Sequence, residues 1–363
     1  MVRRALFAGL ALGPIVILLH YVADLDETAE FVVAAIALIP LAWLIGEATE
    51  HAAEHTGPGI GGFLNATFGN APELIIALLA VHEGLTEVVR GSLTGSVVGN
   101  LLLVLGFSLL FGQPGELDRR SSFMSFAVIG IAIVLFLIPA IPSWHGDPDR
   151  NAIVDLSVPV SIVLLVVYAV TTYVSLRRHR ELHEAGDEAA EAWSLRRALA
   201  VLGAATVVTA LVAEVLVGSL ETFAEKAGLS DFFVSAVIVA IVGNAAEHGG
   251  AVVVAYRGKV KLAAEIALAS AAQVAVFLIP AVVLLSWLIE PLALGFRQIE
   301  IFALAGGLVV ATVTLWGGNA SKARGAVLVA AYVVVVVLFY AAGDRDGHSE
   351  AVSANAAGAL VSG

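Results

Sequence analysis

Eleven apolar stretches, each long enough to cross a lipid bilayer as a helix, occupy most of the 363-residue sequence. A bilayer core takes about 20 predominantly apolar residues per helix. The stretches lack the period-two alternation of barrel strands. Charged residues make up only 14% of the chain, whereas a soluble domain carries about 25%. The sequence therefore predicts an all-α, polytopic membrane protein with spans near residues 5–22, 30–55, 63–82, 88–111, 122–141, 156–176, 198–220, 231–255, 262–289, 299–316 and 325–342.

The Lys and Arg residues predict the orientation of these spans, because cytoplasmic loops carry an excess of both. With a cytoplasmic N-terminus and eleven crossings, fourteen of the 19 basic residues are cytoplasmic. The first stretch follows Arg3 and Arg4 and also suits a cleaved signal peptide, but it is long and lacks a clear cleavage site. We interpret it as a retained span. The five basic residues then predicted to be external are Arg90, Arg150, Lys226, Arg297 and Arg345.

A short polar motif occurs twice, each time inside an apolar stretch. Gly69-Asn70-Ala71-Pro72-Glu73 returns 174 positions later as Gly243-Asn244-Ala245-Ala246-Glu247. In each copy the amide and the carboxylate are three residues apart and lie on one face of a helix. Two such pairs indicate one site built by duplication. Other gap-free matches at this offset are Ala66, Ala77, Gly84 and Ser96 with Ala240, Ala251, Gly258 and Ser270.

Each copy contains five predicted spans, so the two halves of the chain should have opposite orientations in the membrane. Inverted repeats of this kind place substrate sites near mid-membrane, on interrupted helices. Pro72 after Gly69 predicts an interruption in the first copy, and Gly243, Gly249 and Gly250 predict one in the second. The expected organisation is an N-terminal helix and external loop (1–29), a first repeat (30–176), an acidic cytoplasmic linker (177–197), an inverted second repeat (198–343) and a polar tail (344–363).

Glu73 and Glu247 are the candidate ion-binding residues. A charged carboxylate at the bilayer centre costs about 2.5–3.5 kcal/mol or more, and two facing carboxylates also repel each other. A cation can therefore bind only as protons leave. Ca²⁺ takes six to eight oxygen ligands. The amides of Asn70 and Asn244 and freed backbone carbonyls would supply oxygens, and Ser96 and Gln273 on neighbouring helices would add to them.

These residues also carry a family resemblance. The first motif, followed by Gly95-Ser96-Val97-Val98-Gly99-Asn100, and the second, followed by Ala269-Ser270-Ala271-Ala272-Gln273, resemble the two signature repeats of the cation/proton exchangers. The resemblance implies a Ca²⁺/H⁺ antiporter of the plasma membrane, working by alternating access, with lipid, a cation and protons as its only expected partners. It needs no cofactor and leaves the oligomeric state open.

The resemblance further implies that Glu50 and Glu221 line the access paths for ions and protons, and that His248 has a proton-linked role. Acids recur on these helices: Glu47, Glu50 and Glu54 share one face, as do Glu214, Glu221 and Glu225. The acidic linker is either a solvated connection or an ion-attracting cytoplasmic element. Gly99, Ala269 and Ala272 stand where the family commonly has Ser, Gly and a hydroxyl residue, so Na⁺ or K⁺ exchange on the same frame remains an alternative.

Other classes of function fit less well. A gated cation channel would also need mid-membrane carboxylates. The string His51-Ala52-Ala53-Glu54-His55 has the pattern of an inverted zinc-peptidase motif, although Glu54 already belongs to the repeat, and we expect no enzyme. No basic patch suggests nucleic acid, and the absence of cysteine excludes disulfides and thiolate metal sites. Gly91, Gly95 and Gly99 recur every four residues and predict a close helix-packing face.

Overall fold

The computed structural model describes residues 2–23, 25–56, 61, 64, 67–182 and 193–345. Within these ranges the chain is almost entirely helical, which confirms the predicted all-α class. Strands β1 (Gly115–Glu116) and β2 (Asn319–Ala320) form one short antiparallel pair. The first half has α1 (Val2–Gly9), α2 (Leu12–Val22), α3 (Glu27–Glu54), α5 (Ala71–His82), α6 (Thr86–Val98), the π-helix η1 (Gly99–Val104), α7 (Leu105–Phe111), α8 (Arg119–Ser143) and α9 (Asn151–Leu182).

The second half is interrupted more often. It contains α10 (Leu195–Gly218), α11 (Leu220–Ala227), α12 (Asp231–Phe233), the π-helix η2 (Val234–Val239), α13 (Ala240–Gly243), α14 (Ala245–Tyr256), α15 (Val260–Gln273), the π-helix η3 (Val274–Leu278), α16 (Ile279–Ser286), α17 (Gln298–Leu315) and α18 (Lys322–Ala342). The π-helical turns were not predicted; such turns often mark functional sites inside helices.

In the part of the chain that the structure describes, nine helices are long and apolar enough to cross a membrane, or ten if the bent pair α11 and α12–α13 is one span. The shorter apolar helix α5 occupies part of a further predicted stretch. The predicted count of eleven is therefore consistent with the structure. The predicted stretch 198–220 differs in detail. Helix α10 ends at Gly218, and Glu221 and Glu225 lie on the separate helix α11, so Glu214 does not share a continuous helix with them.

Corresponding elements of the two halves begin 174 residues apart. This offset relates the first residues of α5 and α14, of α6 and α15, and of α7 and α16. The capping residues Asn70 and Asn244 have similar backbone angles (φ −100°, ψ 15° and φ −88°, ψ 5°). Gly84 and Gly258, after α5 and α14, have φ of 74° and 85°, which favours glycine. The duplication seen in the sequence is thus a duplication of backbone conformation.

The predicted helix interruptions are present, but they lie at the asparagines. Pro72 occupies the first turn of α5, where a missing N–H costs nothing. The second copy breaks at the same point without a proline. Gly249 and Gly250 lie within α14 and do not interrupt it, which corrects that part of the prediction. In both copies the chain therefore turns just before a helix whose third residue is the candidate glutamate.

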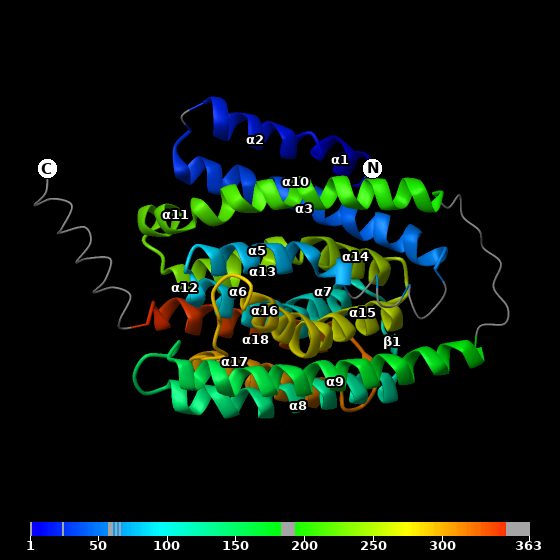
Figure 1. Cartoon of the computed structure of the whole chain (residues 1–363). Coiled ribbons are helices and arrows are strands. Elements are labelled where there is room, and N and C mark those ends of the chain that lie inside the picture. The colour runs from blue at the N-terminus through cyan, green and yellow to red at the C-terminus, as the bar shows by residue number, and fades with distance from the viewer. Residues whose placement is uncertain are drawn as a thin grey trace, which may run out of the picture.

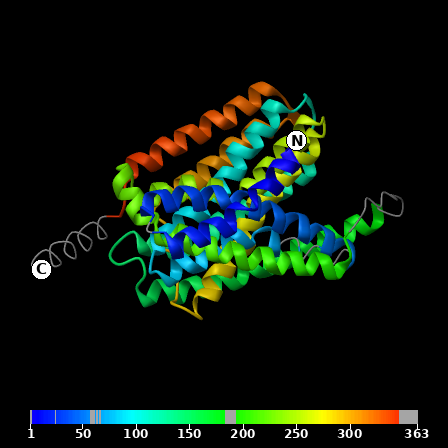
Figure 2. The same ribbon diagram turned by 90° about the horizontal axis from the view of Figure 1, so that it is seen from above.

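The broken helices lie in the middle of the bundle. In Figure 1, α2, α3 and α10 lie along one side, α8 and α9 along the other, and α5, α6, α14 and α15 between them. Figure 2 shows the same bundle from above, with α18 along one edge. The large hydrophobic core runs through the central helices and joins the two halves. Asn70, Glu73 and Asn244 are accordingly buried inside the bundle.

The glycine face of α6 packs directly on η2. A methyl group on Gly95 would overlap the carbonyl oxygen of Ala236, and one on Gly91 would overlap the hydroxyl of Ser235. The predicted packing role is confirmed for these two glycines. It is wrong for Gly99, which has no atom within 4 Å of the position of a Cβ. The backbone contact joins the first half directly to the second.

Candidate functional site

Glu73 and Glu247 each pack against the motif glycine of the opposite half. A Cβ on Gly243 would lie 3.2 Å from Cγ of Glu73, and a Cβ on Gly69 would lie 3.8 Å from Oε1 of Glu247. Each glutamate is in the first turn of its helix, where the backbone N–H groups and the helix dipole favour negative charge. The two helix N-termini thus approach each other with their acids between them. We call this arrangement the paired-glutamate site.

The motif asparagines contact side chains of the opposite half. Asn244, fully buried, donates from Nδ2 to the hydroxyl of Ser96 at 2.8 Å and to the carbonyl oxygen of Ala240 at 2.9 Å. Asn70, also buried, donates to Oε1 of Gln273 at a long 3.5 Å. The structure therefore brings all four predicted neighbours, Asn70, Asn244, Ser96 and Gln273, to the two breaks.

Two further site residues were not predicted. Ser270 donates a hydrogen bond to Oε2 of Glu247. Asn100 donates from Nδ2 to Oδ1 of Asn244 at 3.3 Å and to Oγ of Ser270 at 3.0 Å. Ser270 was detectable, because it is the repeat partner of Ser96. The position equivalent to Asn100 in the second repeat is occupied by Val274, so comparison of the two repeats does not identify Asn100 as a site residue.

Two oxygens of this site are buried without a hydrogen-bond partner among the described residues: Oε2 of Glu73 and Oδ1 of Asn100. Glu73 also lines a void of about 10 Å³ together with Ser92 and Ser96, the size of roughly one water molecule. Buried acceptors are normally satisfied. The site thus offers carboxylate, amide and hydroxyl oxygens that suit a hard cation as transported substrate.

The predicted access-path acids lie apart from this site. Glu50 on α3 and Glu221 on α11 are exposed. Across the described ranges, no hydrogen bond or ion pair joins either of them to Glu73 or Glu247. They remain candidates for the mouths of the paths and are not ligands of the paired-glutamate site.

The two histidine predictions have different outcomes. His248, next to Glu247 on α14, is half-buried, and its Nε2 has no hydrogen-bond partner among the described residues. His55 bonds the carbonyl oxygen of Trp193 through Nε2 at 2.7 Å, and His51 stacks on the Trp193 ring at 4.7 Å. Over the described chain, no group of three or more His, Asp or Glu residues could hold a metal. The zinc-peptidase alternative therefore has no support.

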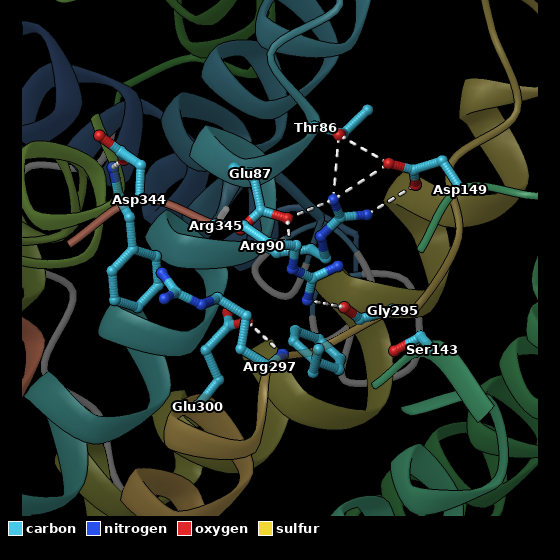
Figure 3. Close-up of polar contacts among 12 residues, drawn as sticks. Thr86, Glu87, Arg90, Ser143, Asp149, Gly295, Arg297, Glu300, Asp344 and Arg345 are labelled. Atoms are coloured by element: carbon cyan, nitrogen blue, oxygen red, sulfur yellow. Dashed lines mark hydrogen bonds and ion pairs between the residues drawn. The ribbon is translucent and has the colours of Figure 1, made fainter. Parts of the chain in front are cut away.

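A second polar cluster lies at the opposite end of α6 from Asn100 and was not predicted (Figure 3). Arg90, 1% exposed, pairs with Glu87 at 2.7 Å and with Asp149 at 2.7 Å. Arg345 Nε lies 3.4 Å from Glu87, and Arg297 donates to the carbonyl oxygens of Ala342 and Gly343. We call these residues, with the buried Glu300 that accepts from Thr94 at 2.9 Å, the arginine cluster.

The arginine cluster stabilises the charged form of Asp149, which lies in the loop before α9. Burial opposes the charged form of Asp149, but the Arg90 guanidinium and the hydroxyl of Thr86 outweigh burial and hold the pKa of Asp149 below its usual range. The cluster ties α6 of the first half to the C-terminal end of α18 and to the loops before α9 and α17 (Figure 3). Its side chains line a cavity of about 840 Å³ at this end of the molecule.

A polytopic helical bundle with inverted halves, and with paired buried carboxylates at two helix breaks, defines a membrane ion transporter and not an enzyme. The sequence profile described as sodium/calcium exchanger protein matches residues 28–177 and 197–341. The chain belongs to this family, which confirms the resemblance seen in its motifs.

Individual relatives match over nearly the full chain. The Ca²⁺/H⁺ antiporter ChaA of Bacillus subtilis is 38% identical over 350 residues, covering 92% of this chain and 97% of its own. The vacuolar cation/proton exchanger 1a of Oryza sativa is 36% identical over 360 residues, covering 93% and 79%. The solved structure of native YfkE superposes with a TM-score of 0.80 at 34% identity and covers 92% of this chain and 99% of its own.

Proposed function

We propose that this chain is a proton-coupled antiporter that exports Ca²⁺ or a related cation from the cytoplasm by alternating access around Glu73 and Glu247. The observation that carries the proposal is the reciprocal packing of each glutamate on the opposite half, beside two buried oxygens that have no hydrogen-bond partner in the described part of the chain. Relatives named as Ca²⁺/H⁺ antiporters support the choice of ions.

Exchange follows from the electrostatics of this pair. Two buried carboxylates near each other cannot both stay charged without a compensating cation. Protons neutralise them when the cation leaves, and the cation replaces the protons when it binds. Two protons per Ca²⁺ would be electroneutral. His248 is the candidate carrier of a third proton. Exchange of three protons for one Ca²⁺ would move one net charge across the membrane, and the membrane potential would then contribute about 2.3 kcal/mol per 100 mV.

Orientation and organisation complete the proposal. The excess of Lys and Arg in the loops on one side supports a cytoplasmic N-terminus, and the proposed location is the plasma membrane. The five proposed segments are those predicted from the sequence; most of the linker 177–197 and of the tail lies outside the described residues. Glu50 and Glu221, exposed near helix ends, guide ions at the two mouths.

Flux measurements on purified protein in proteoliposomes test this proposal. A pH jump should drive uptake of Ca²⁺ in preference to Mn²⁺, Na⁺ and K⁺, and Glu73→Gln or Glu247→Gln should abolish it without unfolding the protein. Glu83→Gln, an exposed acid at the end of α5, is the matched control and should transport normally. Preferred Na⁺ or K⁺ flux would favour the monovalent alternative, and single-channel currents would favour a channel. Transport surviving either glutamate change would overturn the scheme.

A further inference from the structure

A cavity of about 420 Å³ lies between α8 and α17, and none of its lining residues belongs to the paired-glutamate site or the arginine cluster. The two helices lie side by side (Figure 1) and pack where Leu308 approaches Gly130, with Cδ2 3.5 Å from the position of a Cβ there. The cavity lies nearer the start of α8 and the end of α17. Its lining includes Arg119, Arg120, Phe123, Phe126, Leu315 and Trp316, and we call it the α8–α17 groove.

The apolar part of the α8–α17 groove is open to the outside of the bundle. Phe123 on α8 is 62% exposed, and Trp316, just after α17, is 68% exposed. Phe126 and Leu315 are buried and continue the apolar lining inward. An exposed tryptophan at the end of a membrane-spanning helix belongs at the level of the lipid headgroups. The groove is therefore placed where headgroups meet acyl chains.

Two arginines line the same groove. Arg119 and Arg120 are the first residues of α8, and both are exposed. Within the described ranges, neither guanidinium group has a hydrogen bond or an ion pair. The adjacent acid Asp118 instead accepts the backbone N–H groups of Arg120 and Ser121 and pairs with Lys261 at 3.4 Å. Both guanidinium groups are therefore available to an anion from outside the chain.

The backbone holds the first of these charges next to Trp316. Strand β1 pairs with β2, and the N–H of Leu117 donates to the carbonyl oxygen of Gly318 at 2.8 Å, so the loop entering α8 is bonded to the turn that leaves α17. A Cβ on Gly318 would overlap the side-chain stem of Arg119. Arg119 thus lies over the turn that follows Trp316, and the charged and aromatic parts of the groove are fixed together.

We propose that the α8–α17 groove binds one anionic phospholipid, with its phosphate on Arg119 and Arg120 and an acyl chain along Phe123 and Trp316. Guanidinium groups bind phosphate through paired hydrogen bonds. The apolar lining suits an acyl chain, which a free phosphate ion lacks. The loops at this end are predicted to be cytoplasmic, and the cytoplasmic leaflet carries anionic lipids. This site is independent of the transported ion and of the paired-glutamate site.

Native mass spectrometry of the purified full chain tests the charged part of the site. Titration with phosphatidylglycerol should show one tightly held lipid that phosphatidylcholine does not replace. Arg119→Gln combined with Arg120→Gln should weaken its retention on the order of tenfold or more, because each basic residue near an anionic lipid adds to the affinity. Arg196→Gln combined with Arg197→Gln, an exposed pair at the start of α10, is the matched control and should retain the lipid.

Two outcomes of this titration would overturn the site. Equal losses in the two double variants would show that retention follows net charge and not the groove. Binding of inorganic phosphate that displaces the lipid as readily as added phosphatidylglycerol does would show a phosphate site without a lipid. Unchanged unfolding midpoints in both double variants would establish that either result concerns binding and not folding.

Tryptophan fluorescence tests the apolar part of the site. The emission of Trp316 is the difference between the unsubstituted protein and Trp316→Phe. In phosphatidylcholine vesicles that contain a small fraction of phosphatidylglycerol brominated on its acyl chains, this emission should be quenched beyond the value for random mixing. Brominated phosphatidylcholine at the same fraction should give only the random value. Trp287, 51% exposed just after α16, is the control, and its emission should respond equally to both lipids.

Equal quenching of Trp316 by the two brominated lipids would contradict the proposal. Emission of Trp316 that changes with protein concentration and not with lipid would assign the groove to a second copy of the chain, which also overturns it. Neither measurement involves transport, so failure of the lipid site would leave the proposed antiport standing, and loss of antiport would leave the lipid site standing.

Discussion

Gly243 lies against the side chain of Glu73, and the fit is tighter than the matching contact of Gly69 with Glu247. The expected Cβ distances are 3.2 Å to Cγ of Glu73 and 3.8 Å to Oε1 of Glu247. The first distance is shorter than ordinary van der Waals contact, so the helix break at Gly243 tolerates an added methyl group less well than the break at Gly69.

Gly243→Ala should therefore impair transport more than Gly69→Ala. Overpacking of this kind costs about 1–3 kcal/mol, which corresponds to about tenfold or more in exchange rate, because the added methyl displaces the Glu73 carboxyl. Initial rates of pH-driven flux in proteoliposomes measure both variants. Equal losses would contradict the asymmetric fit.

Gly95→Ala should destabilise the fold, whereas Gly99→Ala should not. The methyl at position 95 overlaps the backbone of Ala236, while position 99 has free space. Backbone atoms cannot move aside as a side chain can, so we expect a loss of at least about 1–3 kcal/mol. The unfolding midpoint in detergent is the measurement. A midpoint for Gly95→Ala equal to that of Gly99→Ala would show that α6 and η2 separate easily.

Arg90→Met should be among the most destabilising changes outside the site. It leaves Glu87 buried beside only the more distant Arg345, and Asp149 without its main partner. Removing one member of a buried pair costs about 3–5 kcal/mol. Arg257→Met, at an exposed position, is the control. Similar unfolding midpoints for both variants would show that the arginine cluster contributes little.

Acid should weaken the cluster through Asp149. Its folded-state pKa is lowered, so its contribution to stability is fully present above the ordinary aspartate pKa of about 3.9 and is lost as pH falls through the folded value. Asp149→Asn should remove this part of the acid dependence and leave a flatter stability curve below about pH 4. Unfolding midpoints between neutral and acid pH test it. An unchanged slope would mean that Asp149 is not linked to folding.

Asn100→Leu should weaken cation binding. The change keeps the side-chain size but removes a buried amide that contacts Asn244 and Ser270, and whose oxygen has no hydrogen-bond partner within the described ranges. Loss of one such contact costs about 1–2 kcal/mol, so KM should rise about tenfold. Ser108→Ala, a buried residue of α7 outside the site, is the control. An unchanged KM would exclude Asn100 from the ion path.

Sequence patterns were sufficient wherever local chemistry decides structure. The length and apolar character of the stretches determined the spans, because a bilayer leaves few alternatives to a helix. The repeat determined the positions of the helix breaks, since Asn70 and Asn244 adopt the same backbone conformation in similar local sequences. Ser270 could have been added to the candidate site by the same argument.

Only the tertiary structure decided which residues meet across the two halves. Asn100 contacts Asn244 from a helix 144 positions away, and Arg90 finds Asp149 in a distant loop; neither pairing has a periodic or repeated signal. Equivalent positions of the duplicated pattern are also buried differently: Gly95 on α6 has no room for a side chain, whereas Ala269 on α15 is exposed. The sequence specifies each helix and its polar residues. Packing between the halves determines which of two equivalent helix faces is buried, because burial depends on the relative position of whole helices.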